Sequence, residues 1–184
     1  MILKNNFYVI TGGPGCGKTT LIDELCRRGY DHVPEAARAI IRQQVNTHGD
    51  ALPWMDTRKY SDMMLSWSVR DFTMRTGSDR LCFFDRGIPD TYGYEILMGF
   101  DGNPLLEQAL NHYRYNPKVF ILPPWKEIYL TDTERKQDFQ EALRTYRVIK
   151  DAYKRSGYRL VEIPPAPVSI RADMVEKHMM DNEL

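Results

Sequence analysis

Several features that would assign a protein to a specialised class are missing from this sequence. Its 25 lysine and arginine residues are matched by 25 aspartate and glutamate residues, so it lacks the basic excess that favours nucleic acid as the main partner. No apolar run approaches the roughly 18 residues of a membrane span. The first residues also lack the apolar core of a signal peptide. We therefore expect a cytoplasmic protein without a membrane span or a nucleic-acid partner.

Cysteine is also scarce, and an odd number of thiols does not suit a disulfide framework. The three, Cys16, Cys26 and Cys82, are expected to stay reduced, as thiols do in the cytoplasm. The histidines have no metal-site spacing with the cysteines and are interpreted as structural or surface residues; they are His32, His48, His112 and His178. With 42% hydrophobic and 27% charged residues the composition is that of an ordinary globular protein, so motifs must decide the class.

The most informative segment is a glycine-rich loop near the N-terminus. It reads GGPGCGKT and fits the phosphate-loop pattern G-x-x-x-x-G-K-[ST]. An apolar run at 7–10 precedes it, and Leu21, Ile22 and Leu25 follow at helical spacing. The loop therefore joins a strand to a helix N-terminus, where free backbone N–H groups and the helix dipole favour an anion. We expect a nucleoside triphosphate to bind here, on Gly12, Gly13, Pro14, Gly15, Cys16, Gly17, Lys18, Thr19 and Thr20.

Two side chains of this loop have specific expected roles. Lys18 can reach the β- and γ-phosphates, and the hydroxyl of Thr19 can hold Mg²⁺. The expected cofactors are ATP and Mg²⁺, and GTP remains possible because the pattern itself does not read the base. No N-K-x-D or T-K-x-D motif for reading guanine occurs, so an ordinary Ras-like GTPase is not expected.

Strand-like and helix-like segments alternate along the chain, which favours an α/β fold with a parallel sheet. Five strands are expected, at 7–10, 30–34, 81–84, 118–122 and 159–163. Helices are expected at 18–28, 35–45, 57–76, 89–97, 104–113, 137–156 and 168–180. The prediction is a P-loop NTPase domain over 1–184, with three layers, α/β/α, around a five-stranded parallel sheet. Its ligand site should lie at the carboxyl ends of the strands.

Polar residues follow the second and third expected strands. Asp85 ends the third strand and can hold a water on Mg²⁺, and Arg86 can neutralise a transferring phosphoryl group. The alternative interpretation is that Asp85 only caps the helix that follows the strand. Glu35 follows the second strand, where it should lie beside the phosphate loop and can accept a proton from a substrate hydroxyl. Alternatively, it is only an acidic residue favoured by the dipole of the following helix.

A proline-flanked polar segment at about 123–137 follows the fourth expected strand. We interpret it as a lid over the phosphates, with Arg135 as the candidate to stabilise charge in the transition state. A solvated charged loop is the alternative interpretation. The helix at 57–76, with Trp67 and Arg70, and the loop at 46–56 are expected to line the acceptor pocket.

Three signatures together resemble one family. They are GGPGCGKTT at the phosphate loop, VPEAAR after the second strand and FFDRGIPD at the third. They resemble the small kinase-like P-loop ATPase family of the AAA-domain type, which includes the ribosylnicotinamide kinase domain, and more distantly deoxynucleoside and thymidylate kinases. The resemblance implies a nucleotide-kinase-like fold, a base role for Glu35, and an acid–arginine pair at Asp85 and Arg86. The segment at 132–135 is similar to the lid of this family.

Two functions stay open at this point. The first is a Mg-ATP-dependent phosphotransferase or ATPase, with Thr19 and Asp85 holding the metal and a small-molecule phosphoryl acceptor. Its catalytic residues would be Lys18, Glu35, Asp85, Arg86 and Arg135. The second is a nucleotide-dependent switch that binds a protein or lipid partner.

Overall fold

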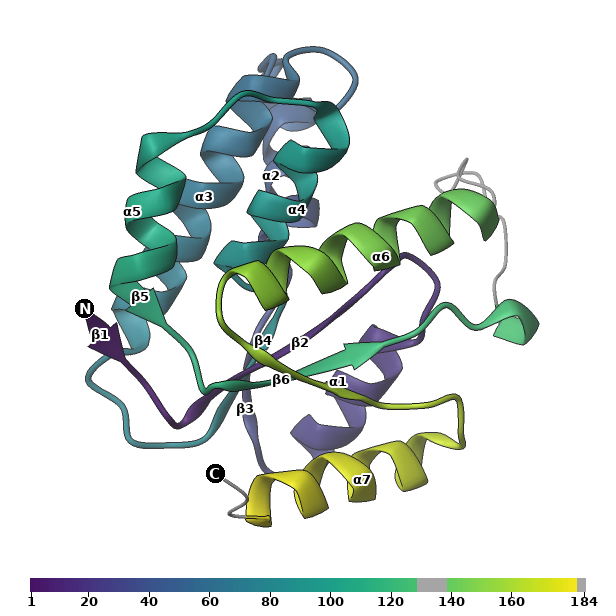
Figure 1. Cartoon of the computed structure of the whole chain (residues 1–184). Coiled ribbons are helices and arrows are strands. Elements are labelled where there is room, and N and C mark those ends of the chain that lie inside the picture. Colours follow the sequence, from purple (N-terminus) through teal and green to yellow (C-terminus); the bar gives the residue numbers. More distant parts are fainter. Residues whose placement is uncertain (129–138, 182–184) are drawn as a thin grey trace.

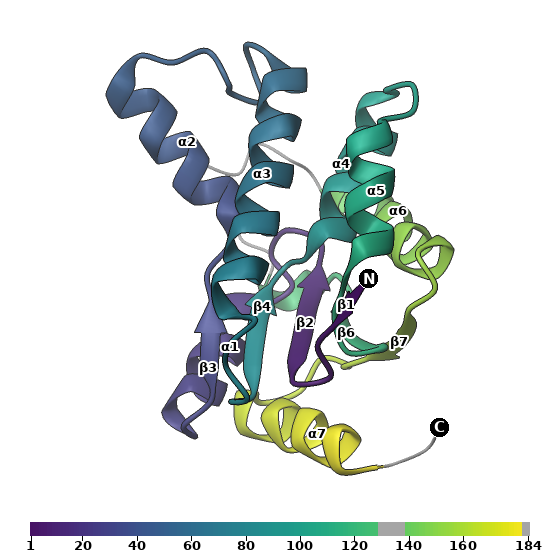
Figure 2. The same ribbon diagram turned by 90° about the vertical axis from the view of Figure 1, so that its left-hand side faces the viewer.

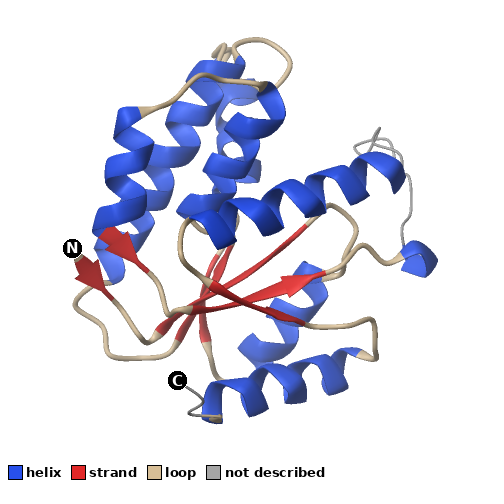
Figure 3. Ribbon diagram, viewed as in Figure 1, coloured by secondary structure: helices blue, strands red, loops and turns tan. Residues whose placement is uncertain are grey.

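The computed structural model describes residues 1–128 and 139–181. A five-stranded sheet, parallel throughout, lies between two layers of helices (Figures 1 and 3). Its strand order is β3-β4-β2-β6-β7. The strands are β2 Phe7–Gly12, β3 Asp31–Val33, β4 Cys82–Asp85, β6 Lys118–Leu122 and β7 Arg159–Glu162. The predicted α/β fold with a five-stranded parallel sheet is therefore confirmed.

Helices cover the two faces of the sheet unequally. Helices α1, Lys18–Arg27, and α7, Val168–Met180, pack side by side on one face. The other face carries α3, Thr57–Arg75; α4, Ile88–Met98; α5, Pro104–His112; and α6, Phe139–Arg155. Helix α2, Ala36–Thr47, packs on α3 through Ile40, Tyr60 and Met64. Figure 2 shows α2, α3 and α4 extending past the carboxyl ends of β2, β3 and β4.

The central strand β2 shows why this sheet forms. All six of its residues are buried, as expected for a parallel strand that is covered on both faces. Phe7 and Val9 belong to the core beneath α3, α4 and α6, whereas Tyr8 and Ile10 belong to the core beneath α1 and α7. At the end of the strand, a Cβ on Gly12 would lie 2.5 Å from the carbonyl oxygen of Leu122, so only glycine allows β2 and β6 to approach this closely.

A few local details differ from the sequence-based expectations. Two short strands, β1 Ile2–Leu3 and β5 Tyr113–Arg114, pair in parallel as a separate small sheet and were not predicted. Since Tyr113 belongs to β5, helix α5 ends at His112. A short 3₁₀ helix, η1 Lys126–Ile128, follows β6.

All three cysteines are free, as their odd number indicated. Within residues 1–128 and 139–181, no helix has the length and apolar character needed to cross a membrane.

Candidate functional site

The phosphate loop connects β2 to α1 in a conformation that glycine makes accessible. Gly15 and Gly17 have φ angles of 68° and 78°, in the left-handed region where other residues are strained. Helix α1 starts directly after Gly17, and no side chain of the described residues caps its N-terminus. The first N–H groups of α1 therefore have no side-chain acceptor, which is the arrangement that binds an anion at a helix N-terminus.

Lys18, the first residue of α1, lies next to Asp85 at the end of β4. β2 pairs with β4 so that Ile10 is level with Asp85, which brings the end of β4 next to the phosphate loop. Lys18 is 9% exposed, and its Nζ lies 4.0 Å from Oδ1 of Asp85. That Oδ1 is buried and has no hydrogen-bond partner among the residues described. A buried carboxylate oxygen without a partner is costly, so it is available for a ligand.

Asp85 does not cap the following helix, which was the alternative interpretation. The N-terminus of α4 is instead capped by Asp90, whose Oδ2 accepts a 2.9 Å hydrogen bond from the N–H of Gly87. Burial raises the pKa of Asp85 and is the largest effect. The positive charge of Lys18 lowers this pKa and the negative charge of Glu35 raises it, and the net shift is upward. Positive charge arriving at this carboxylate would reverse that shift.

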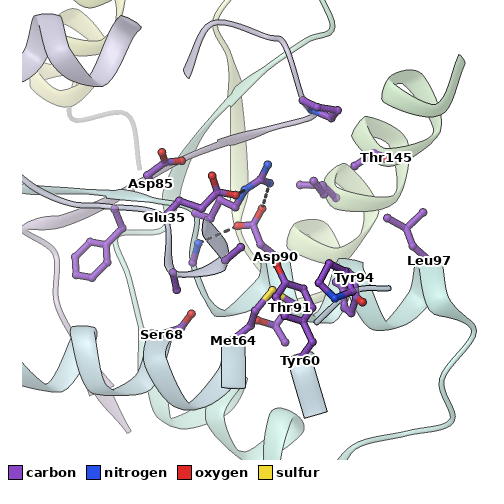
Figure 4. Close-up of a pocket in the computed structure, with 18 of the residues that line it drawn as sticks. Glu35, Tyr60, Met64, Ser68, Asp85, Asp90, Thr91, Tyr94, Leu97 and Thr145 are labelled. Atoms are coloured by element: carbon purple, nitrogen blue, oxygen red, sulfur yellow. Dashed lines mark hydrogen bonds and ion pairs between the residues drawn. The ribbon is translucent and has the colours of Figure 1, made fainter. Parts of the chain in front are cut away.

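Glu35 and Arg86 form a half-buried ion pair next to these residues (Figure 4). Nε of Arg86 donates a 2.7 Å hydrogen bond to Oε1 of Glu35, and its Nη1 donates a 3.0 Å bond to Oδ1 of Asp90. Arg86 has a φ of 73°, which is uncommon for a residue other than glycine. In the strand order β4 lies between β2 and β3, so the end of β4 separates Glu35 from the phosphate loop, and Glu35 and Pro14 of the loop line the same cavity.

Asp90 is the residue of this cluster that the sequence analysis missed. Its carboxylate accepts hydrogen bonds from the hydroxyls of Thr11, at 2.6 Å, and Tyr153, at 2.5 Å, besides those from Arg86 and Gly87. β2, α4 and α6 thereby fix one carboxylate, which in turn orients Arg86. A sequence signal existed, because an acidic residue three positions after a helix N-cap is typical of a capping box.

The charges around Glu35 determine its ionisation. Burial alone raises the pKa of this carboxyl, but Arg86, Lys18 and Arg38 outweigh burial and lower the pKa to about 2. Glu35 is therefore ionised at neutral pH, and it is a weak base while Arg86 is bound to it.

This pKa predicts a dependence of stability on pH. The ordinary pKa of 4.5 falls to about 2 in the folded protein, so Glu35 stabilises the fold above pH 4.5 and loses this contribution as the pH falls towards 2. We expect the difference in unfolding free energy between wild type and Glu35→Gln to shrink across that range. Urea unfolding at a series of pH values measures it, and a constant difference would contradict the pKa shift.

A cavity of about 340 Å³ opens directly beyond this cluster (Figure 4). Glu35, Asp85, Arg86 and Asp90 form its end near the phosphate loop. Its walls come from three helices: Tyr60, Met64, Ser68 and Asp71 from α3; Thr91, Tyr94, Leu97 and Met98 from α4; and Glu141, Arg144, Thr145 and Ile149 from α6. The site thus combines a charged end with largely apolar walls, as small-molecule sites do.

The expectation about Trp67 and Arg70 is wrong, because neither lines this cavity. The guanidinium of Arg70 stacks over the ring of Trp67 and pairs with Asp71. Of the loop at 46–56, Pro53 lines the cavity. The contribution of α6 was not predicted. Arg135 and most of the expected lid lie outside the described residues, and of the segment 123–137 the structure describes 123–128.

The residues present fit a magnesium ion bound together with phosphates. Thr19 lies exposed at the start of α1, and Asp85 offers its unpartnered Oδ1. Hydroxyl and carboxylate oxygens are the donors that Mg²⁺ prefers, usually completed by water and substrate phosphates. Within the described ranges, no group of three or more histidine, cysteine, aspartate or glutamate side chains could hold a metal ion by itself.

Comparison with known proteins gives one family and several solved structures. The model of a family described as an AAA domain matches residues 7–171. No curated protein matches the chain. Among solved structures, thymidylate kinase from Ehrlichia chaffeensis is similar with 17% identity and a TM-score of 0.65, over 96% of this chain and 98% of that one.

Two further structures extend this likeness. Deoxyadenosine kinase from M. mycoides is similar with 15% identity and a TM-score of 0.64, over 94% of this chain and 98% of that one. A NadR protein in complex with NR is similar with 14% identity and a TM-score of 0.68, over 96% of this chain but 51% of that one. At these identities the likeness is one of fold, which is the P-loop fold of nucleotide kinases.

Proposed function

The chain belongs to the AAA-domain family, and from this membership and the geometry of the site we propose that it is a Mg-ATP-dependent phosphotransferase acting on a small-molecule acceptor. The observation that carries the proposal is the convergence of Lys18, Asp85 and Glu35 at one end of a cavity of about 340 Å³. A phosphate loop, a metal-binding carboxylate and a potential base therefore border one space, where a donor and an acceptor can meet.

The phosphate loop and its neighbours would hold the donor. The backbone N–H groups at the start of α1 bind phosphate oxygens, and Lys18 carries positive charge to the β- and γ-phosphates. Thr19 and Asp85 would hold Mg²⁺, Asp85 directly or through a water. When bound, the ion supplies neutralisation of phosphate charge.

Glu35 would act on the acceptor. Its carboxylate lines the cavity and can accept the hydrogen of an acceptor hydroxyl. A carboxylate with a pKa of about 2 is a weak base, so orienting the hydroxyl is the larger part of its contribution. This suits phosphoryl transfer, in which positioning and electrostatic stabilisation dominate over covalent chemistry.

Arg86 would position Glu35 rather than contact the transferring group. Both Glu35 and Asp90 hold its guanidinium, and the hydrogen bonds of Asp90 fix this arrangement. Moving Arg86 to a phosphate would break two half-buried ion pairs, each with a charge-assisted hydrogen bond, which is costly.

The charge of the cavity favours an acceptor without a phosphate of its own. Of the described residues that line it, five are acidic and two are basic, namely Arg86 and Arg144. Since Arg86 is already paired with two carboxylates, a second phosphate would meet an excess of negative charge. We infer a hydroxyl compound with an apolar or aromatic body, such as a nucleoside, for the space between Tyr60, Met64 and Tyr94.

The proposal is tested by ATP turnover with Mg²⁺, alone and against a panel of nucleosides, nucleotides and vitamin-like ribosides. We expect one unphosphorylated hydroxyl compound to stimulate turnover strongly and to appear as its phosphate ester. Preference for a nucleotide would refute the inference on acceptor charge. Slow turnover that no small molecule stimulates would favour the alternative, a nucleotide-dependent switch with a protein or lipid partner.

A further inference from the structure

A buried arginine lies behind the phosphate loop and has no role in the site as described so far. Arg171 of α7 is 3% exposed. Its Nη1 donates a 3.1 Å hydrogen bond to the carbonyl oxygen of Gly17, the last residue before α1. The guanidinium also lies over the ring of Trp125, 5.5 Å from the ring centre. α7 packs along α1 (Figure 1), and Arg171 extends from α7 to the peptide at the start of α1.

Arg171 lacks the acidic partners that a purely structural arginine would have. Among the described residues no carboxylate pairs with it, and its Nε is buried without a hydrogen-bond partner. Arg28, in the same interface between α1 and α7, pairs with three carboxylates, those of Glu24, Asp173 and Glu176. A buried charge without a counter-charge costs several kcal/mol. The position of Arg171 therefore calls for an anion that the described residues do not provide.

The hydrogen bond to Gly17 connects this charge to the nucleotide site. In a trans peptide the C=O of one residue and the N–H of the next point in opposite directions. The carbonyl of Gly17 accepts from Arg171 and from the N–H of Leu21, so the N–H of Lys18 points towards the phosphate site. A hydrogen bond to the carbonyl polarises the peptide and strengthens the N–H as a donor.

We propose that Arg171 is a positioning residue for the nucleotide phosphates. It fixes the peptide between Gly17 and Lys18 with its N–H towards the phosphates, and it places a buried positive charge behind the loop that bound phosphate offsets. The inference rests on the nucleotide binding contained in the proposed function, but it requires neither the acceptor nor the role of Glu35.

The test compares nucleotide affinity with stability in three variants of Arg171. We expect Arg171→Met and Arg171→Gln to weaken the binding of MgADP, measured by calorimetry, by about tenfold or more, and Arg171→Lys to recover part of the loss. The unfolding free energy of nucleotide-free Arg171→Met should stay close to that of wild type, because an unpaired buried charge has been removed. If Arg171→Met does not fold, the MgADP affinity and the stability of Arg171→Gln and Arg171→Lys are compared with those of wild type instead.

Arg28→Met is the matched control. It removes an arginine from the same interface but leaves three carboxylates without their partner, so it should lower stability and leave the MgADP affinity unchanged. If Arg171→Met and Arg171→Gln bound MgADP as tightly as the wild type, the assignment would be overturned. If these variants lost stability but kept their MgADP affinity, Arg171 would have only a structural role. Failure of the wild type to bind MgADP would overturn the proposed function itself, and this assignment with it.

Discussion

Replacing Glu35 by glutamine is expected to slow phosphoryl transfer by about 100- to 10,000-fold, the usual contribution of a positioned acid or base. Glutamine has almost the same shape and its amide oxygen can still accept the 2.7 Å hydrogen bond from Arg86, so the fold should persist. With its one oxygen bonded to Arg86, glutamine has only an NH₂ group left, which can neither accept the hydrogen bond that orients an acceptor hydroxyl nor take its proton. Because Glu35 does not belong to the phosphate loop, the affinity for MgATP should remain close to that of wild type.

Single-turnover measurements at saturating MgATP and acceptor would separate this chemical step from binding. Glu95→Gln is a suitable control because Glu95 is also a buried acid, on α4 and 4% exposed. It accepts hydrogen bonds from Ser61 and Asn103, away from the phosphate loop. The control should keep its transfer rate even if its stability falls. Unchanged transfer in Glu35→Gln would refute the assignment of Glu35 as base.

Replacing Lys18 by alanine is expected to weaken MgATP binding by about 30-fold or more, since removing one partner of a buried charge pair costs about 2–5 kcal/mol. The lysine is 9% exposed, so little water screens its charge from a bound phosphate. Its loss also leaves Asp85 next to Glu35 without the cation at 4.0 Å, which should raise the pKa of Asp85 further.

Calorimetric titration with MgATP and MgADP would measure this loss directly. Lys150→Ala serves as the control, because Lys150 pairs with Glu162 on the exposed side of α6 and should bind nucleotide like the wild type. If Lys18→Ala bound MgATP as tightly as the wild type, the phosphate loop would not be the nucleotide site.

Local patterns in the sequence predicted most of the secondary structure. The bounds of β6 and α7 were predicted to the residue, because prolines follow Leu122 and precede Val168. The convergence of Glu35, Asp85 and Arg86 followed from the rule that parallel strands present their carboxyl ends at one edge. Each of these predictions depended on residues adjacent in sequence or on a general property of parallel sheets.

The missed features depend on packing between distant segments. Apolar residues occur around most of the circumference of α3, so periodicity did not show that Met64 rather than Trp67 faces the cavity. The contacts of Asp90 with Thr11 and Tyr153 join residues 79 and 63 positions apart. The strand order, which inserts β4 between β3 and β2, likewise has no local signal.

The hydrogen bond between Arg171 and Gly17 joins residues 154 positions apart. During synthesis the complete glycine-rich loop leaves the ribosome early, whereas Arg171 follows only after all strands of the five-stranded sheet have been made. A nascent chain that stops before α7 would therefore contain every residue of the phosphate-loop motif and still present an incompletely ordered loop. In this protein the capacity to hold a nucleotide would mature late in folding, at the step in which α7 docks against α1.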